Sequence, residues 1–225
     1  MLPPFDAMLF DFDGTLAVLN LDFAAMRRRV VALAVTYDLA SATLEGMYIL
    51  EMVEYATTLL QQQHPKRAED FFQQAHQLIQ DIEVEAAQSS RLIPGVAELL
   101  ETLRQRRIGV GIVTRNCAVA VRHMFPQVEQ YCQAFLPRDY VTQVKPHPGH
   151  LQTALTRLGT APSRTIMVGD GVLDIQAGKA LGMFSVGVLS GETPRHRLMA
   201  QGADLILASA ADLLPYLHEH WEATA

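Results

Sequence analysis

The sequence predicts an α/β fold in which a doubly wound parallel sheet carries an inserted helical segment. After about residue 91, short apolar segments of strand length alternate with segments of helical periodicity, which is typical of a parallel sheet. Between residue 17 and about residue 91, apolar residues recur only at the three-to-four-residue spacing of helices. We therefore expect a core made of residues 1–16 and 92–225, and a helical domain made of residues 17–91.

Each expected element follows from its local pattern. The first strand is the apolar stretch that stops at Asp11, and Pro65 should break the helical insert into two long arms. The expected later strands are residues 108–113, 134–136, 165–168, 184–188 and 204–207. The expected later helices are residues 94–107, 117–124, 150–158, 175–181 and 211–219.

Composition and charge describe an ordinary globular protein. The chain has 225 residues, of which 49% are apolar and 19% are charged. Its 18 basic and 24 acidic residues give a net charge of 18 − 24 = −6, without a long block of one sign. This pattern indicates neither a nucleic-acid surface nor a surface for anionic membranes. An anionic substrate would therefore need local positive charge or a metal.

The first apolar stretch contains acidic residues, and no apolar run approaches the length of a membrane span. We therefore expect no secretory signal and no membrane segment, and a cytoplasmic location. The two cysteines, Cys117 and Cys132, lack the spacing of metal ligands, and a reducing compartment disfavours a disulfide between them.

Two carboxylates stand two residues apart in the segment FDFDGTL, residues 10–16. Asp11, at the end of a strand, could act as a nucleophile. Asp13 could act as an acid or base, because Gly14 lets the chain turn sharply beside it. The two acids would repel each other, and a bound cation would relieve that repulsion. The alternative is a strand followed by an ordinary Asp-Gly turn.

Polar side chains also follow later strands, and ligands bind at the carboxyl ends of strands in such sheets. Thr114 and Asn116 follow the strand at residues 108–113, although Asn116 could also cap the next helix. Lys145 stands in VKPHP, where two prolines fix the backbone, although an isolated loop lysine usually faces solvent.

A second pair of acids follows the strand at residues 165–168. Asp170 ends the strand, and Asp174 comes one helical turn later on the same side. Either could be an ordinary turn or cap residue, but together they supply hard oxygen ligands.

Four motifs in this order resemble those of the haloacid dehalogenase superfamily, in the branch of small phosphoglycolate-phosphatase-like enzymes. They are FDFDGTL at 10–16, IVTRN at 112–116, VKPHP at 144–148 and VGDGVLDIQAG at 168–178. The resemblance implies a Rossmann-like core, with residues 17–91 as a small all-helical cap domain that decides substrate specificity. It covers essentially the whole core.

The resemblance also implies an Mg²⁺-dependent phosphatase that hydrolyses a small-molecule phosphate monoester. Asp11 would attack phosphorus to form an aspartyl-phosphate, and Asp13 would protonate the leaving alcohol and then activate water. Mg²⁺ would be held by the Asp11 carboxylate, the backbone carbonyl of Asp13 and the Asp170 carboxylate. Asp174 would orient a metal-bound water or Lys145.

Thr114, Arg115, Asn116 and Lys145 are the residues that the resemblance assigns to phosphate binding. Arg115 stands where many members have a small residue or no residue at all. Its side chain could touch phosphate, contact the cap domain or face solvent.

Three other functions use parts of the same pattern. A phosphomutase would share the core acids and the cap domain, and the sequence does not separate it from a phosphatase. A dehalogenase would need neither Asp13 nor Asp170, and a non-catalytic binding protein would be expected to have lost one of the acids. The expected partner is a small phosphorylated molecule, without nucleic acid or membrane. The sequence indicates neither its identity nor an oligomeric state.

Overall fold

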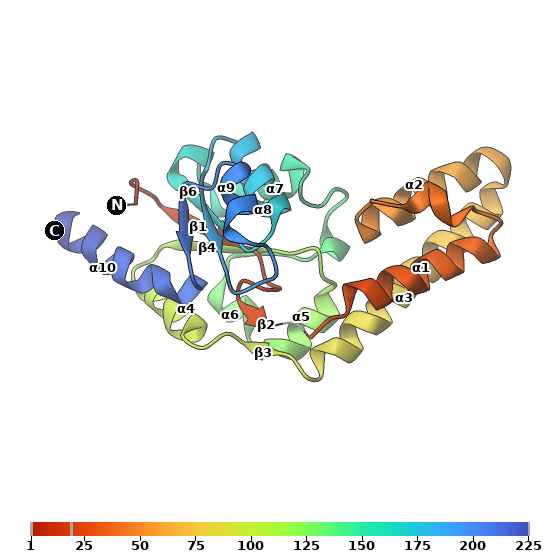
Figure 1. Cartoon of the computed structure of the whole chain (residues 1–225). Helices are drawn as coiled ribbons and strands as arrows, with labels where there is room; N and C mark the ends of the chain where they lie inside the picture. Colours follow the sequence, from red (N-terminus) through yellow and green to blue (C-terminus); the bar gives the residue numbers. More distant parts are fainter. Residues whose placement is uncertain (1, 19, 225) are drawn as a thin grey trace. The chain divides into compact units, whose positions relative to one another are not determined.

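The centre of the fold is a six-stranded parallel sheet with the order β5-β4-β1-β6-β7-β8 (Figure 1). The structure is a computed structural model that describes residues 2–18 and 20–224; Met1, Leu19 and Ala225, which the expected domain bounds include, lie outside the described residues. The strands are β1 (Ala7–Phe10), β4 (Gly109–Val113), β5 (Ala134–Leu136), β6 (Thr165–Gly169), β7 (Phe184–Val188) and β8 (Leu205–Leu207). The α/β fold class expected from the sequence is therefore confirmed.

Strand β1 is the point at which the strand order reverses. It pairs in parallel with β4 on one side, where Phe10 faces Ile112, and with β6 on the other, where Phe10 faces Val168. The chain passes from β1 to β4 and β5, and then crosses to β6, β7 and β8. In sheets of this kind the ligand site lies outside the carboxyl end of the strands at this reversal.

Helices cover both faces of the sheet (Figure 1). Because successive strand residues point to opposite faces, Met8 and Phe10 pack in one apolar cluster with residues of α4, α5 and α10, whereas Leu9 packs in another with residues of α7 and α8. The helices of this part are α4 (Val96–Gln105), α5 (Ala118–Met124), α6 (Val128–Tyr131), α7 (Pro148–Leu158), α8 (Val172–Ala180), α9 (Arg195–Ala200) and α10 (Leu213–Thr224). Short 3₁₀ turns occupy Arg138–Tyr140, Pro162–Arg164 and Ala210–Asp212.

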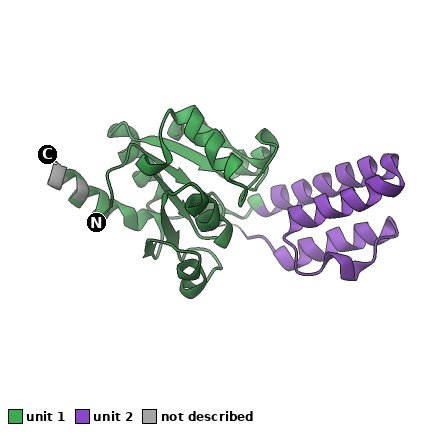
Figure 2. Cartoon of the chain, turned by 90° about the horizontal axis from the view of Figure 1, so that it is seen from above, with its two compact units in different colours: residues 1–19, 87–225 green, residues 20–86 purple. Residues whose placement is uncertain are grey.

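The chain divides into two compact units, one of Met1–Leu19 with Ala87–Ala225 and one of Asn20–Ala86 (Figure 2). The second unit is helical and contains α1 (Phe23–Thr36), a 3₁₀ turn (Ser41–Leu44), α2 (Ile49–Gln63) and most of α3 (Pro65–Ala87). Pro65 begins α3, so the expected break falls where the sequence placed it. Of the two expected arms, the one after Pro65 is a single helix, whereas the one before it is divided into α1 and α2, because the chain also turns at Asp38 and Gly46, whose φ angles are 66° and 75°.

The expectation of helix throughout residues 17–91 is wrong at both ends of the segment. Strand β2 (Ala17–Val18) pairs with strand β3 (Arg91–Leu92) in a two-stranded antiparallel sheet. Strands of two residues are too short to show the alternation by which strands are recognised in sequence. The helical unit is accordingly narrower than the expected domain.

The helical unit has its own apolar core. Met26 and Val30 of α1 are buried, as the spacing predicts, and α3 buries Phe71. Phe23 and Phe72 belong to the same predicted stripes, but they are 50% and 41% exposed. Within the part of the chain that the structure describes, no helix has both the length and the apolar character needed to cross a membrane.

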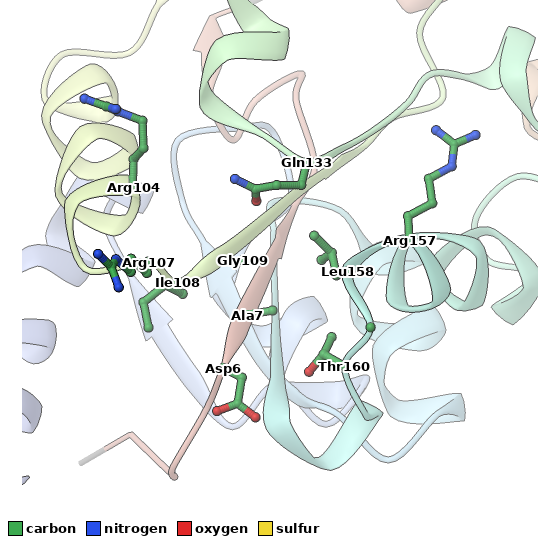
Figure 3. A pocket seen from close by; sticks show the side chains of 11 residues that line it. Asp6, Ala7, Arg104, Arg107, Ile108, Gly109, Gln133, Arg157, Leu158 and Thr160 are labelled. Carbon is green, nitrogen blue, oxygen red and sulfur yellow. The ribbon is translucent and has the colours of Figure 1, made fainter.

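A cavity of about 640 Å³ opens at the amino ends of β1 and β4 (Figure 3). Its lining includes Arg104, Arg107 and Arg157, together with Asp6 and Gln133. This edge is opposite to the carboxyl ends of the strands, where the sequence places its candidate site residues. The cavity therefore takes no part in the site described below.

Candidate active site

The residues predicted from the sequence lie at the carboxyl ends of three neighbouring strands. Asp11 follows β1, Thr114 follows β4 and Asp170 follows β6. The backbone N–H of Asp11 donates to the carbonyl oxygen of Val168 at 2.9 Å. This bond extends the pairing of β1 with β6 by one residue and so fixes Asp11 at the edge of the sheet.

The turn after Asp11 packs directly against Asp170. Gly14 has a φ of 75°, and a Cβ atom there would lie 2.5 Å from Oδ2 of Asp170, so glycine is required both by the backbone and by the space. The Thr15 hydroxyl donates to Oδ1 of Asp170 at 3.0 Å and accepts from its backbone N–H, also at 3.0 Å. Thr15 was missed in the sequence, although it belongs to the FDFDGTL motif.

Lys145 is the buried cation of the site. Its side chain is 1% exposed, and Nζ lies 2.7 Å from Oδ1 of Asp11 and 2.6 Å from Oδ1 of Asp174. Oδ2 of Asp174 accepts the backbone N–H of Gly171 at 2.8 Å. Both oxygens of Asp174 therefore accept hydrogen bonds from the protein.

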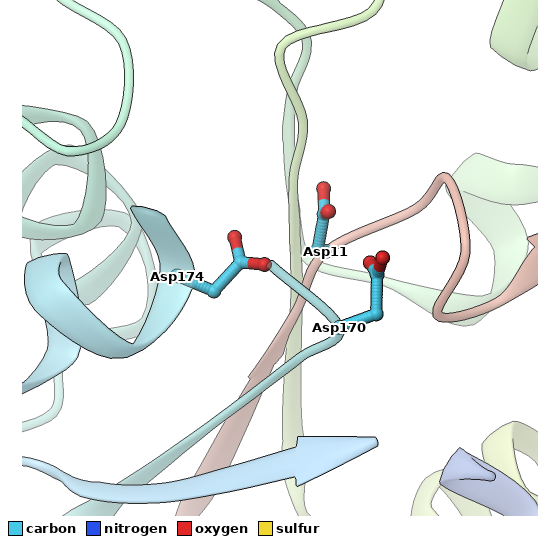
Figure 4. Close-up of side chains that lie close together, drawn as sticks. All are labelled: Asp11, Asp170 and Asp174. Atoms are coloured by element: carbon cyan, nitrogen blue, oxygen red, sulfur yellow. The ribbon is translucent and has the colours of Figure 1, made fainter. Parts of the chain in front are cut away.

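Three carboxylates gather around this cation. Asp11, Asp170 and Asp174 each offer an oxygen, and these oxygens all lie within 4.8 Å of one another (Figure 4). Burial, followed by the charge of Asp174, raises the pKa of Asp11 to about 7, although Lys145 opposes the shift. Burial and the charge of Asp11 also raise the pKa of Asp170 well above its ordinary value. One lysine therefore leaves negative charge at this site uncompensated.

The donor set fits a hard divalent cation. Carboxylate oxygens at this spacing are the ligands that Mg²⁺ and similar ions prefer, and such an ion would offset the excess negative charge. Asp11 and Asp170 are the better candidates for direct ligands, since the hydrogen bonds of Asp174 engage both of its oxygens.

The Asp13 carboxylate lies outside this group of oxygens. Its Oδ1 accepts a hydrogen bond from Nδ2 of Asn116 at 3.0 Å, and its Oδ2 accepts one from the Thr114 hydroxyl at 3.3 Å. Two residues expected to bind phosphate thus hold Asp13 in this structure. Asn116 does not cap α5; the cap is Cys117, whose Sγ accepts from the backbone N–H of Ala120 at 3.4 Å.

Arg115 and His150 contact the backbone of Lys145. The Arg115 guanidinium donates to the backbone carbonyl of Lys145, and Arg138 in turn donates to the carbonyl of Arg115 at 3.1 Å. His150 is fully buried, and its Nδ1 accepts the backbone N–H of Lys145 at 3.2 Å. Burial, together with the charge of Lys145, lowers the pKa of His150 to about 3, so the ring is neutral. His150 was not identified as a site residue from the sequence. The only signal for it in the sequence is its position five residues after Lys145.

This fold and this group of acids define a hydrolase of the haloacid dehalogenase type. The family model described as haloacid dehalogenase-like hydrolase matches residues 8–188, and the chain belongs to this family. The family expected from the sequence motifs is therefore confirmed.

Similar proteins include a haloacid dehalogenase-like hydrolase domain-containing protein of Arabidopsis thaliana, 30% identical over 84% of this chain and 72% of the relative. The phosphoglycolate phosphatase of Escherichia coli strain K12 is 34% identical over 59% of this chain. That match spans 53% of the bacterial protein, or about half its length. The crystal structure of a hydrolase from Pseudomonas syringae has the same fold, with a TM-score of 0.69, 22% identity, and coverage of 95% of this chain and 98% of that one.

Proposed function

We propose that the protein is an Mg²⁺-dependent phosphatase that hydrolyses a small-molecule phosphate monoester through an aspartyl-phosphate intermediate. The observation that carries the proposal is the contact of buried Lys145 with Asp11, beside the acids Asp170 and Asp174. A carboxylate nucleophile, a fixed cation and further acids for a metal are what phosphoryl transfer through an aspartyl-phosphate requires of a protein.

In the first step, Asp11 attacks phosphorus in line with the leaving alcohol. A bond forms between a carboxylate oxygen and phosphorus, the bond from phosphorus to the alcohol oxygen breaks, and Asp13 donates its proton to that oxygen. Lys145 holds Asp11 in place and balances charge on the phosphoryl oxygens. Thr114 supports the phosphoryl group when its hydroxyl turns from Asp13, which lies 3.3 Å away.

In the second step, Asp13 takes a proton from water, and the water oxygen attacks phosphorus. The bond to Asp11 breaks, inorganic phosphate leaves, and both carboxyl groups return to their starting states. The hydrogen bond from Asn116 keeps the Asp13 side chain ordered at the end of β4.

Asp11, the backbone carbonyl of Asp13 and Asp170 would hold Mg²⁺, as the sequence motifs imply. When bound, the ion supplies positive charge that stabilises the transferring phosphoryl group. Within the protein, Asp174 keeps Lys145 in position, and Thr15 keeps Asp170 oriented through its two hydrogen bonds.

The helical unit would serve as the cap domain that selects the substrate, and a cytoplasmic location fits a small phosphorylated metabolite. Phosphoglycolate is the first ester to test, because the Escherichia coli relative is named a phosphoglycolate phosphatase.

The experiment is to measure phosphate release from an aryl phosphate and a panel of metabolite phosphomonoesters, with Mg²⁺ or with chelator. Release that requires Mg²⁺ supports the proposal. A folded protein that releases no phosphate from any ester contradicts it, and conversion of a sugar phosphate to its isomer would indicate a phosphomutase.

A further inference from the structure

We propose that His150 is a positioning residue, which fixes Lys145 relative to Thr114, and that Arg115 is the second support of the same lysine. The inference rests on the proposed phosphatase function, in which Lys145 and Thr114 hold the phosphoryl group. It concerns how the loop that carries Lys145 and the loop that carries Thr114 are held in fixed positions relative to each other.

Both backbone polar groups of Lys145 are held by side chains. Its N–H donates to Nδ1 of His150 at 3.2 Å, and its carbonyl accepts from the guanidinium of Arg115. No helix or strand includes Lys145. These two side chains therefore satisfy the backbone hydrogen bonds that a helix or strand would otherwise satisfy, and they determine where the lysine backbone lies.

His150 also connects this loop to the loop after β4. Because Nδ1 accepts a hydrogen bond, the proton of the neutral ring is on Nε2, and Nε2 donates to the carbonyl oxygen of Leu136 at 3.0 Å. The same carbonyl accepts the backbone N–H of Thr114 at 3.1 Å. The carbonyl oxygen of Leu136, at the end of β5, thus connects Thr114 to His150. The other ring nitrogen of His150 connects this oxygen to the backbone of Lys145.

Packing alone does not require a histidine at this place. The neighbouring buried residues of α7 are apolar: Leu151, Ala154 and Leu155. A leucine in place of His150 would fill the same kind of space, but the buried N–H of Lys145 would lose its acceptor. What the imidazole adds is one acceptor and one donor on opposite sides of a rigid ring.

The precision matters because Nζ of Lys145 contacts two carboxylates at once, at 2.7 Å and 2.6 Å. A small shift of the lysine backbone would move Nζ away from Asp11 or from Asp174. Misplacement by about 1 Å can cost on the order of 100-fold in rate.

Three substitutions of His150 separate its two hydrogen bonds. His150→Leu removes both, His150→Asn keeps an acceptor close to the place of Nδ1, and His150→Gln keeps a donor close to the place of Nε2. Arg115→Met removes the second support at a half-buried position. Thr165→Val is the matched control, because it removes a hydrogen bond of a buried side chain, to Ala161 at 2.9 Å, at the opposite edge of the sheet.

We expect His150→Leu to lower kcat by about 100-fold. His150→Asn should recover roughly tenfold of that loss, since it restores the acceptor for Lys145. Inhibition by orthovanadate should weaken more than inhibition by inorganic phosphate, because vanadate resembles the transition state that a well-placed lysine stabilises. Thr165→Val should lower the melting temperature and leave kcat unchanged.

A crystal structure of His150→Leu gives a readout that does not depend on activity. The inference requires that Nζ of Lys145 loses its contact with Asp11 or with Asp174. It is wrong if the lysine keeps both contacts, or if folded His150→Leu keeps kcat within about twofold of the unaltered protein. If His150→Leu does not fold, His150→Asn and Arg115→Met give the same comparison. Should the unaltered protein hydrolyse no ester, the proposed function fails, while the position of Lys145 in these variants still decides the inference.

Discussion

Nζ of Lys145 lies 2.7 Å from Oδ1 of Asp11, and the lysine side chain is 1% exposed. A cation buried this deeply is retained only when acids compensate it, and here Asp174 is the second acid, at 2.6 Å. Burial opposes the charged form of Lys145, but the two carboxylates more than offset it, and the pKa of the lysine is raised. Asp11 thus gains a permanent positive neighbour.

Replacing this lysine should abolish most activity. Lys145→Met keeps an unbranched apolar side chain but leaves Asp11 and Asp174 without their cation, so we expect kcat to fall by roughly 100- to 1000-fold. Steady-state kinetics on the best substrate measures the effect. Lys179→Met is the control. It removes an ion pair in which Nζ of Lys179 lies 2.8 Å from Oδ2 of Asp204, and this pair lies outside the site. Equal activities of the two variants would contradict the role of Lys145.

Removal of the metal should affect stability in a pH-dependent way. Folding raises the pKa of Asp11 to about 7 and also raises that of Asp170, so without metal the folded state binds more protons than the unfolded state between about pH 4 and pH 7. The metal-free protein therefore loses this contribution to stability as the pH rises through that window. We expect Mg²⁺ to raise the melting temperature more at pH 7.5 than at pH 5.

His150 changes stability with pH in the opposite direction to Asp11 and Asp170. Its pKa is lowered to about 3 in the folded state, so below about pH 6.5 the unfolded state binds a proton that the folded state does not, and stability falls as the pH falls. The comparison with and without Mg²⁺ at one pH removes this contribution. Asp170→Asn is the control, and it should lose most of the Mg²⁺-induced shift. An equal shift at both pH values, or an undiminished shift in Asp170→Asn, would contradict the assignment of the acids to a metal site.

Asp13 should be needed most for the second step. Asp13→Asn retains the shape of the side chain and loses the base that activates water, so we expect turnover to fall by about 100- to 10,000-fold. With an aryl phosphate, whose leaving group needs little protonation, phosphoenzyme should accumulate. Mass spectrometry of the acid-quenched protein detects it. An Asp13→Asn protein that turns over at the normal rate would show that another residue is the base.

Gly14 can be tested against a glycine of the same backbone conformation. Gly14 and Gly46 both have a φ of 75°, but a Cβ at Gly14 would lie 2.5 Å from Asp170, whereas a Cβ at Gly46 meets nothing within 4 Å. Both alanine substitutions should cost about 1 kcal/mol of backbone strain. Gly14→Ala should in addition weaken the Mg²⁺-induced shift in melting temperature and lower kcat. Equal effects of the two substitutions would mean that the turn does not position Asp170.

Much of the sheet could be predicted from local patterns. The bounds of β5 and β7 agree with the expectation to the residue. Strands β2 and β3 could not be predicted, since two residues carry no period, and α6 and α9 are too short for a helical stripe.

The site divides in the same way. Positions after strands are readable from sequence, so Asp11, Thr114 and Asp170 could be placed at one edge of the sheet. Contacts that depend on distant backbone atoms could not, because nothing near His150 in the sequence indicates the carbonyl of Leu136. The direction of the Asp13 side chain, toward Asn116 and Thr114, depends on a rotamer that the sequence does not specify.

The most direct test of the central claim is the activity of Asp11→Asn on the ester that the panel ranks first, at saturating Mg²⁺. The substitution removes the nucleophile and one of the two carboxylates that compensate Lys145, while Asp174 remains, so the variant should fold. We predict that it releases no phosphate above background and forms no phosphoenzyme. A folded Asp11→Asn protein that keeps hydrolysing the ester would contradict the assignment of Asp11 as the nucleophile.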